Sequence, residues 1–337
     1  MKKIRIALCG SGRIGRVHAV NIAADARLDF AWVTDPMIAS AREVAGLVGA
    51  TATASMDEVL TDDALDALVI CSPTATHIDL IVAAQARGIA VLCEKPIDLD
   101  LQRVLDSRTI LEGGTSPLMM GFNRRFDPNF SALRRRVAAG EIGRLEQLNI
   151  TSRDVAPAPA GYIAASGGIF RDMSIHDLDM ARFFLPTIVE VTAHGSNVFC
   201  DYIKDAGDFD SAVIVLRGGN GELVTITNSR HSAYGYDQRL EAFGSAGMLS
   251  AANVSPTTVR KFTAEAVDQA DAYEPFFLER YASAYRLELD HFIGCIQSEA
   301  PCTPGFADGL AALELADAAA RSARTGTSVA VSPVVSA

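Results

Sequence analysis

Residues 3–15, KIRIALCGSGRIG, join a short apolar run to a glycine-rich turn, and this stretch decides the N-terminal fold. The apolar run is typical of a strand that is buried on both faces of a sheet. Gly10, Gly12 and Gly15 follow in the order G-x-G-x-x-G, and a helical pattern continues to about Ala24. Glycines at these places permit a tight turn, a close approach of the backbone to a pyrophosphate, and close packing of helix on strand. The stretch therefore predicts the strand–turn–helix that opens a dinucleotide-binding sheet.

A carboxylate follows at the distance that such a site requires. Asp35 lies twenty residues beyond Gly15, at the end of a second apolar run, LDFAWVTD. There it would accept a hydrogen bond from a ribose 2′-hydroxyl and repel a 2′-phosphate, so NAD is favoured over NADP. The alternative is a turn carboxylate preceding Pro36. The predicted cofactor residues of this region are Gly10, Gly12, Arg13, Ile14, Gly15 and Asp35.

The first 121 residues alternate apolar runs with helical patterns. The runs LDALVICSP and IAVLCEKP continue the series, which predicts a doubly wound parallel sheet covered on both faces. After SPLMMGF the rhythm changes to longer runs that alternate apolar and polar residues, including 188–199, 210–219, 221–230, 237–245 and 257–265. These runs predict a second α/β domain, residues 122–337, with an open, mostly antiparallel sheet. A loop is expected over 155–168, and helices over 276–298 and 306–322.

Composition excludes several classes of function. The net charge of −11, from 30 basic and 41 acidic residues, argues against a nucleic-acid partner. No run reaches the roughly 18 apolar residues of a membrane helix. The six cysteines and six histidines have no metal-ligand spacing, so we expect no metal site. Cysteines at the ends of buried strands indicate a reduced compartment, and we expect a cytoplasmic protein.

Two segments at the carboxyl ends of predicted strands contain further candidate site residues, because ligands of open α/β sheets bind at these strand ends. CSPTATH contains Ser72, Pro73 and His77, and CEKP contains Glu94 and Lys95. We expect all five to lie at the cofactor, with His77 in packing rather than in catalysis. For Lys95 the alternative is a solvated loop lysine.

A third segment, GGIFRDMSIHDLDMARFF at 167–184, places Asp172, His176 and Asp179 on one stripe of a predicted helix. Apolar residues flank the stripe, which suggests that it faces a pocket, while Ser174, Asp177 and Ala181 are expected on the solvated side.

Hydride transfer from an alcohol needs a base and a donor to the oxygen. His176 suits the first role, Lys95 the second, and Asp172 would orient the imidazole. The alternative is that Asp172 caps the helix and His176 fills a polar niche.

In order and spacing, the segments GSGRIGRVHA, CSPTATH, CEKP, GFNRRFDPNF, GGIFRDMSIHDLDMARFF and YGYDQR resemble the glucose-fructose oxidoreductase/inositol dehydrogenase family. Within it, SGGIFRDM, GFNRRFD and YGYDQR look most like inositol 2-dehydrogenases. The resemblance implies a Rossmann domain, a second domain whose open sheet forms an oligomer interface, and tetramers. It also implies a catalytic set at Lys95, Asp172 and His176. The substrate contacts that it implies are Arg124, Asp154, Asp179 and Tyr236.

The expected reaction is NAD-dependent oxidation of a ring hydroxyl of a neutral cyclic polyol, here myo-inositol to its 2-keto form, scyllo-inosose. Carboxylates at Asp154, Asp172 and Asp179 suit a polyol as hydrogen-bond acceptors. One alternative is a related sugar dehydrogenase that acts on an aldose, scyllo-inositol or an anhydrosugar. A second is a non-catalytic, dinucleotide-dependent regulator, which need not keep a proton-transfer set.

Overall fold

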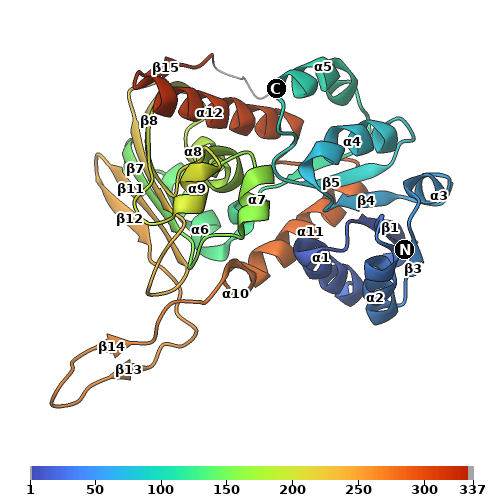
Figure 1. Cartoon of the computed structure of the whole chain (residues 1–337), viewed down its shortest axis with the longest axis horizontal. Helices are drawn as coiled ribbons and strands as arrows, with labels where there is room; N and C mark the ends of the chain where they lie inside the picture. Colours follow the sequence, from blue (N-terminus) through green and yellow to red (C-terminus); the bar gives the residue numbers. More distant parts are fainter. Residues whose placement is uncertain (1, 333–337) are drawn as a thin grey trace. The chain divides into compact units, whose positions relative to one another are not determined.

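The computed structural model describes residues 2–332. Contacts divide the chain into two compact units (Figure 1). The first contains residues 1–123 and 284–313, and the second contains residues 124–283 and 314–337. The segment 284–313 therefore contacts the N-terminal unit although it follows the second unit in sequence.

The first unit is built on a six-stranded sheet in the order β3-β2-β1-β4-β5-β6, with every pair parallel. This confirms the predicted doubly wound sheet, because the order reverses between β1 and β4. The strands are β1 (Ile4–Cys9), β2 (Leu28–Thr34), β3 (Thr51–Thr53), β4 (Ala67–Ile70), β5 (Ala90–Glu94) and β6 (Leu118–Gly121).

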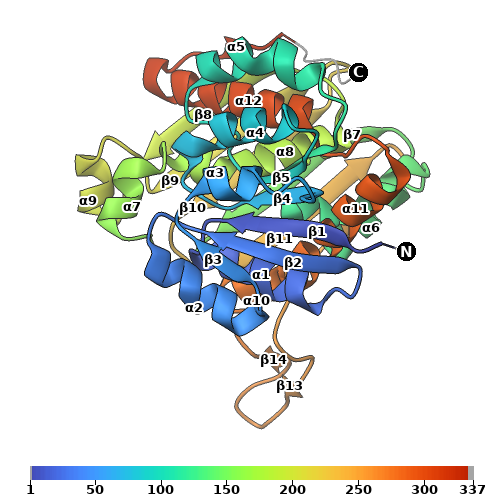
Figure 2. The same ribbon diagram turned by 90° about the vertical axis from the view of Figure 1, so that its right-hand side faces the viewer.

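Helices cover both faces of this sheet. α1 (Arg13–Ala24) and α2 (Ile38–Val48) lie on one face, and α4 (His77–Gln85) and α5 (Leu101–Glu112) lie on the other (Figure 2). α11 (Ala282–Ser298) packs against α1, with the rings of His18 and Tyr285 5.6 Å apart in an edge-to-face contact. Two short helices, α3 (Met56–Leu60) and η1 (Thr74–Thr76), complete the connections.

The second unit contains a seven-stranded sheet in the order β12-β11-β7-β10-β9-β8-β15. Only β10 and β7 pair in parallel among its described strands, so the predicted open, mostly antiparallel sheet is confirmed. The strands are β7 (Leu145–Arg153), β8 (Ile188–Ser196), β9 (Ser211–Gly218), β10 (Leu223–Ser229), β11 (Asp237–Gly244), β12 (Gly247–Ala251) and β15 (Val329–Ala330).

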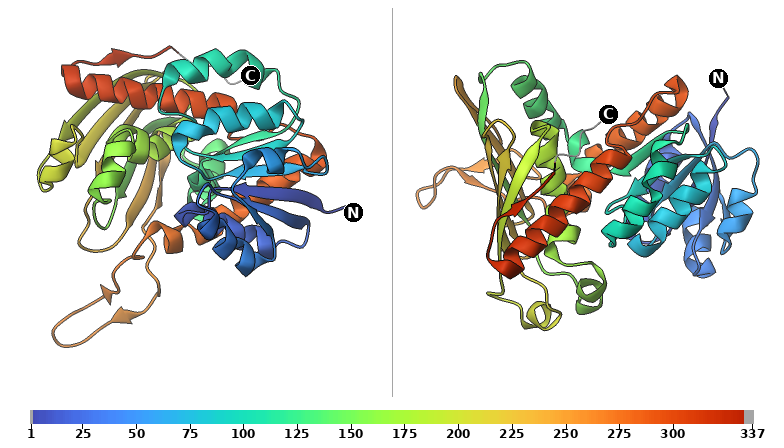
Figure 3. Two further views of the ribbon diagram at one scale, coloured as in Figure 1. Left: turned by 45° about the vertical axis from the view of Figure 1, so that its right-hand side comes forward. Right: turned by 90° about the horizontal axis from the view of Figure 1, so that it is seen from above.

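Helices of the second unit lie on one face of this sheet, while the opposite face carries no helix of residues 2–332 (Figure 3). The alternation in β9 shows the consequence, since Ile214 and Leu216 are buried and Val213 and Val215 are exposed. The helices are η2 (Asn123–Phe126), α6 (Pro128–Ala138), α7 (Ala160–Ala165), η3 (Phe170–Ser174), α8 (Ile175–Phe184), α9 (Asp201–Asp205) and α10 (Phe277–Arg280). α12 (Phe306–Thr325) crosses the boundary between the units.

Three local predictions were wrong. The expected loop at 155–168 contains α7, which begins after Pro159. The expected strand at 257–265 is reduced to β13 (Arg260–Lys261), which pairs with β14 (Gln269–Ala270) in a projecting hairpin outside the main sheet (Figure 1). The helix expected over 276–298 is two helices, because Tyr281 leaves the helical conformation between α10 and α11.

The segment around Asp172 also differs from a regular α-helix. Its first part, η3, is a π-helix, and α8 continues from Ile175. Ser174, Asp177 and Ala181, expected on the solvated side, are all buried. The reason is that Ser174 and Asp177 hydrogen-bond to Asn228 on β10, so this side of the helix packs against the sheet. Extra π-helical residues are frequent at functional sites.

Within residues 2–332, no helix combines the length and the apolar character that crossing a bilayer requires.

Candidate active site

The three glycines of the first loop have different surroundings. Gly10 has φ +94°, and a Cβ there would lie 2.5 Å from the backbone carbon of Cys71. A Cβ on Gly15 would lie 1.9 Å from the oxygen of Gly10, so only glycine allows this turn and helix to pack. At Gly12, the N-cap of α1, a Cβ would meet nothing within 4 Å among the described residues. Open space at a helix N-terminus fits a pyrophosphate.

Asp35 follows β2 and is held by the same loop. Its Oδ2 accepts hydrogen bonds from the Ser11 backbone N–H at 2.9 Å and the Ser11 hydroxyl at 2.8 Å. Its Oδ1 accepts from the Met37 N–H at 2.9 Å. Partial burial opposes ionisation, but these three donors outweigh it and lower the pKa of Asp35. The carboxylate is therefore a charged, oriented acceptor, as the predicted ribose contact requires.

The imidazole of His77 hydrogen-bonds to the loops that follow β4 and β5. Its Nδ1 lies 2.8 Å from the carbonyl oxygen of Pro96 and its Nε2 lies 2.9 Å from that of Ser72. The ring is buried, and burial lowers the pKa of His77 although both carbonyls favour the charged form. His77 thereby links the loop of Ser72 and Pro73 to the loop of Lys95, whose peptide bond with Pro96 is cis.

Glu94 stands at the end of β5, where its carboxylate points inward. Oε1 lies 3.1 Å from His18 Nε2, and Oε2 accepts the backbone N–H of Lys95 at 3.3 Å. Lys95 is half-buried. Arg13 is exposed and Ile14 half-buried in the first turn of α1, beside the glycines. All the predicted cofactor residues therefore belong to the first unit.

In the second unit, Asp172 is the centre of a charged network. Its Oδ1 accepts from the hydroxyl of Tyr162 at 2.8 Å, and its Oδ2 accepts from Arg230 Nη1 at 3.0 Å. Arg230 also donates from Nη2 to Asp208 at 3.2 Å, and Asp208 accepts the N–H of Ile169 at 2.8 Å. Burial opposes the charge on Arg230, but Asp172 and Asp208 outweigh it and raise the pKa of Arg230. Asp172 is thus held from two sides.

Asp179 and Arg124, both expected to contact substrate, are buried in ion pairs. Asp179 is 1% exposed and accepts both Nε and Nη2 of Arg125, at 2.8 and 2.6 Å. Arg124 Nη1 donates to Asp177 at 2.6 Å and to the hydroxyl of Ser152 at 2.8 Å. The two adjacent arginines of GFNRRFD therefore each pair with a different carboxylate of α8.

Tyr236 and Asp154 belong to the same unit. Tyr236 is buried, with its ring 6.1 Å from that of Tyr281 in an edge-to-face contact, and burial raises its pKa well above the usual range. Asp154 follows β7, and its backbone N–H donates a hydrogen bond to the carbonyl oxygen of Ser229 on β10 at 2.9 Å. Arg124 also lies over the ring of Tyr281, 5.6 Å from its centroid.

Asp172 lies in η3 and His176 in the first turn of α8, while Lys95 belongs to the other unit. Four residues of the site were missed by sequence reasoning. The pair RR in GFNRRFD was a signal for Arg125, and the acidic residues of DLDM were a signal for Asp177. Arg230 and Tyr162 had no such signal, because Arg230 meets Asp172 from 58 residues away and Tyr162 lies in the segment read as a loop.

Comparison with known proteins covers nearly the whole chain. Residues 4–122 match the family described as "Oxidoreductase family, NAD-binding Rossmann fold", and residues 130–250 match "GFO/IDH/MocA C-terminal domain". The chain is 44% identical over 320 residues to an inositol 2-dehydrogenase of Rhizobium meliloti, covering 95% of this chain and 96% of that one.

Solved structures agree with this. A myo-inositol dehydrogenase from Corynebacterium glutamicum is 57% identical, with a TM-score of 0.95 over 98% of this chain and 99% of that one. A scyllo-inositol dehydrogenase from Lactobacillus casei, solved with bound NAD(H) and scyllo-inositol, is 27% identical, with a TM-score of 0.89 over 99% of this chain and 100% of that one.

Proposed function

This chain belongs to the GFO/IDH/MocA family of NAD-binding oxidoreductases, and we propose that it oxidises myo-inositol to scyllo-inosose. The observation that carries the proposal is the 57% identity to a myo-inositol dehydrogenase across 98% of the chain, so that both units are matched. A cofactor loop alone would indicate only the family.

In the proposed reaction each residue of the catalytic set has a separate role. Bound NAD supplies the acceptor for hydride from the ring carbon. His176 accepts the proton of the reacting hydroxyl, and Lys95 donates a hydrogen bond to the same oxygen, which stabilises its developing negative charge. Asp172 acts through His176 by holding the imidazole in one orientation. Arg230 and Tyr162 are positioning residues, because they hold the Asp172 carboxylate at 3.0 and 2.8 Å.

We assign cofactor binding to residues 1–121, through Gly10, Gly12, Arg13, Ile14, Gly15, Asp35, Ser72, Pro73, His77, Glu94 and Lys95. Substrate binding falls to residues 122–337, through Arg124, Asp154, Asp179 and Tyr236. Asp179 and Arg124 would act from fixed positions, since each is already held by a buried ion pair. A carboxylate oxygen accepts more than one hydrogen bond, so Asp179 retains acceptor capacity for a hydroxyl.

Substitution of the proton-transfer residues tests these roles. Lys95→Ala and His176→Ala should each abolish NADH formation from myo-inositol while NAD still binds. The matched control is Lys204→Ala, because this side chain is exposed. Full turnover in either site variant would contradict the assignment.

One alternative is supported by a specific observation, namely the similarity to the scyllo-inositol dehydrogenase from L. casei. Initial rates with NAD on myo-inositol, scyllo-inositol, glucose and an anhydrosugar distinguish the candidates. We expect kcat/KM to be highest for myo-inositol. A higher value for scyllo-inositol or for a sugar would assign the chain to the alternative, and no turnover of any of them would favour a regulator.

We also propose that the chain assembles as a cytoplasmic homotetramer through the helix-free face of the second sheet. That face carries the exposed apolar side chains of Val213, Val215, Leu223 and Phe243. The six cysteines are free thiols, as a reducing compartment requires. Val215→Asp should shift the mass in light scattering below that of a tetramer, and an unchanged mass would refute this interface.

A further inference from the structure

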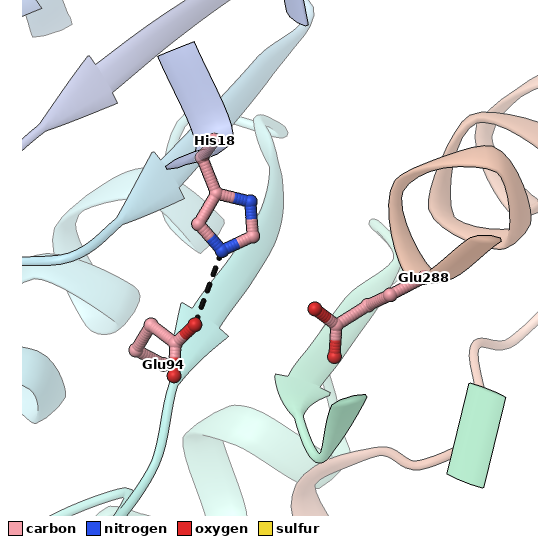
Figure 4. A group of neighbouring side chains, drawn as sticks. All are labelled: His18, Glu94 and Glu288. Atoms are coloured by element: carbon pink, nitrogen blue, oxygen red, sulfur yellow. Dashed lines mark hydrogen bonds and ion pairs between the residues drawn. The ribbon is translucent and has the colours of Figure 1, made fainter. Parts of the chain in front are cut away.

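Three ionisable side chains from distant parts of the sequence meet inside the first unit. His18 lies on α1, Glu94 at the end of β5, and Glu288 on α11, and all three point toward one another (Figure 4). One ligand atom from each of them lies within 4.8 Å of the others. His18 and Glu288 are 0% exposed, and the side chain of Glu94 is 12% exposed.

Glu288 is the unexplained member of this cluster. Neither of its carboxylate oxygens has a hydrogen-bond partner among residues 2–332, although both are fully buried. Burial first and the charge of Glu94 second raise the pKa of Glu288 well above its usual range. A buried carboxylate without a partner costs several kcal/mol, so something must neutralise it.

A proton or a cation could neutralise the charge, and the gathering of three ligand groups around Glu288 favours the cation. A protonated Glu288 would still need an acceptor, and neither of its oxygens has a hydrogen-bond partner among the described residues. A first-row divalent cation has N and O ligands about 2.0–2.2 Å away, so neighbouring ligand atoms lie about 3.0–3.6 Å apart. The His18 Nε2 to Glu94 Oε1 distance of 3.1 Å, which is also a hydrogen bond, lies in this range. The three ligand atoms as a set lie within 4.8 Å of one another, so the side chains would draw closer around a bound cation.

We propose that His18, Glu94 and Glu288 form a binding site for one divalent first-row cation of the Zn²⁺ or Mn²⁺ kind. Two carboxylates balance the two positive charges, and a neutral imidazole adds a nitrogen ligand that Mg²⁺ and Ca²⁺ rarely take. The sequence predicted no metal because residues 18, 94 and 288 share no spacing, and only the packing of α11 on α1 brings them together.

The role of this cation is structural. The second carboxylate oxygen of Glu94 accepts the N–H of Lys95, so a cation on the first oxygen would fix the strand end that carries Lys95. It would also join 284–313 to the N-terminal part of the first unit. The site does not depend on the identity of the substrate.

Direct binding tests the proposal. Protein stripped with a chelator and dialysed against Zn²⁺ or Mn²⁺ should retain one equivalent more than a Glu288→Gln variant by elemental analysis. The matched control is Glu112→Gln, an exposed glutamate of the same unit, which should bind like the wild type. Metal at a hundredfold excess over Kd should raise the Tm of the wild type and of the control by about 5 °C or more, but not that of Glu288→Gln.

Two results would overturn the proposal. One is that the wild type and Glu288→Gln retain equal amounts of both metals. The other is that metal leaves the Tm of the wild type unchanged while Glu288→Gln raises it, because a neutral amide would then replace a protonated acid. If Glu288→Gln does not fold, His18→Gln serves as the comparison, and the stoichiometry of the wild type still decides.

Discussion

Replacing Arg230 by methionine tests whether Asp172 is positioned by charge. Arg230 is 1% exposed and donates to Asp172 at 3.0 Å and to Asp208 at 3.2 Å. Methionine preserves much of the apolar stem and removes every donor, so Arg230→Met leaves two carboxylates without their common cation. Asp172 keeps the hydroxyl of Tyr162, and Asp208 keeps the N–H of Ile169.

The magnitude follows from this residual pairing. Breaking a buried ion pair from one side costs about 3–5 kcal/mol, and the two surviving hydrogen bonds place Arg230→Met near the lower end, at about 3 kcal/mol. Loss of one charge-assisted hydrogen bond to Asp172 is worth about 1.5–3 kcal/mol, which corresponds to a fall of about 10- to 100-fold in kcat. The KM for the polyol should change less, because Arg230 acts through Asp172.

Urea unfolding and NADH formation measure the two effects, and a double-mutant cycle with Asp208→Asn isolates the charge interaction. Because Asp208→Asn removes one of the stranded charges, the double variant should be more stable than the sum of the two single losses by about 1 kcal/mol or more. Arg136→Met, at an exposed arginine of α6 that pairs with Glu141, is the control and should stay within about 0.5 kcal/mol of the wild type. Additivity within about 0.5 kcal/mol, or an unchanged kcat, would contradict the role of Arg230 in positioning Asp172.

The remaining predictions concern the first unit. Asp35→Ser removes the proposed ribose acceptor and its repulsion of a 2′-phosphate, so kcat/KM for NAD should fall about 10- to 100-fold relative to that for NADP, and an unchanged ratio would contradict the assignment. Gly15→Ala places a Cβ 1.9 Å from a backbone oxygen and should lower the Tm, whereas Gly12→Ala should leave the Tm unchanged and weaken NAD binding. Equal Tm values for the two variants would refute the difference in packing. The indole N–H of Trp32 is the largest cause of the lowered pKa of Asp62. The ionised Asp62 therefore stabilises the folded state above about pH 4, and this contribution is lost as the pH falls further. The Tm difference between the wild type and Asp62→Asn should therefore shrink at acid pH, and a constant difference would exclude this origin.

Sequence patterns predicted the first unit well because its determinants are local. The glycines, the buried strands and the strand-end motifs each lie within about ten residues, and their spacing follows from backbone geometry. The second sheet was predicted from alternation in the same way, since β8 to β11 each show one buried and one exposed face.

Patterns failed where a partner distant in sequence decides the environment. A 100° helical repeat placed Ser174 and Asp177 in solvent. Both are instead buried against β10, where Asn228 Oδ1 accepts from the Ser174 hydroxyl and Asn228 Nδ2 donates to Asp177. The same repeat could not anticipate the π-helix of Phe170–Ser174. The helix over 276–298 was divided at Tyr281. The ring of Tyr281 packs against that of Tyr236, which lies between β10 and β11.

Local spacing encodes backbone turns and periodic burial, so the doubly wound sheet, the dinucleotide-binding loop and the candidacy of Lys95, Asp172 and His176 can all be predicted from sequence patterns. The groups that hold these side chains in place follow instead from contacts between distant parts of the chain. Arg230 reaches Asp172, Arg125 reaches Asp179, and Glu288 meets His18 and Glu94 across separations of tens to hundreds of residues. Such contacts depend on how helices pack on sheets, and no local pattern records which buried charge will face which partner.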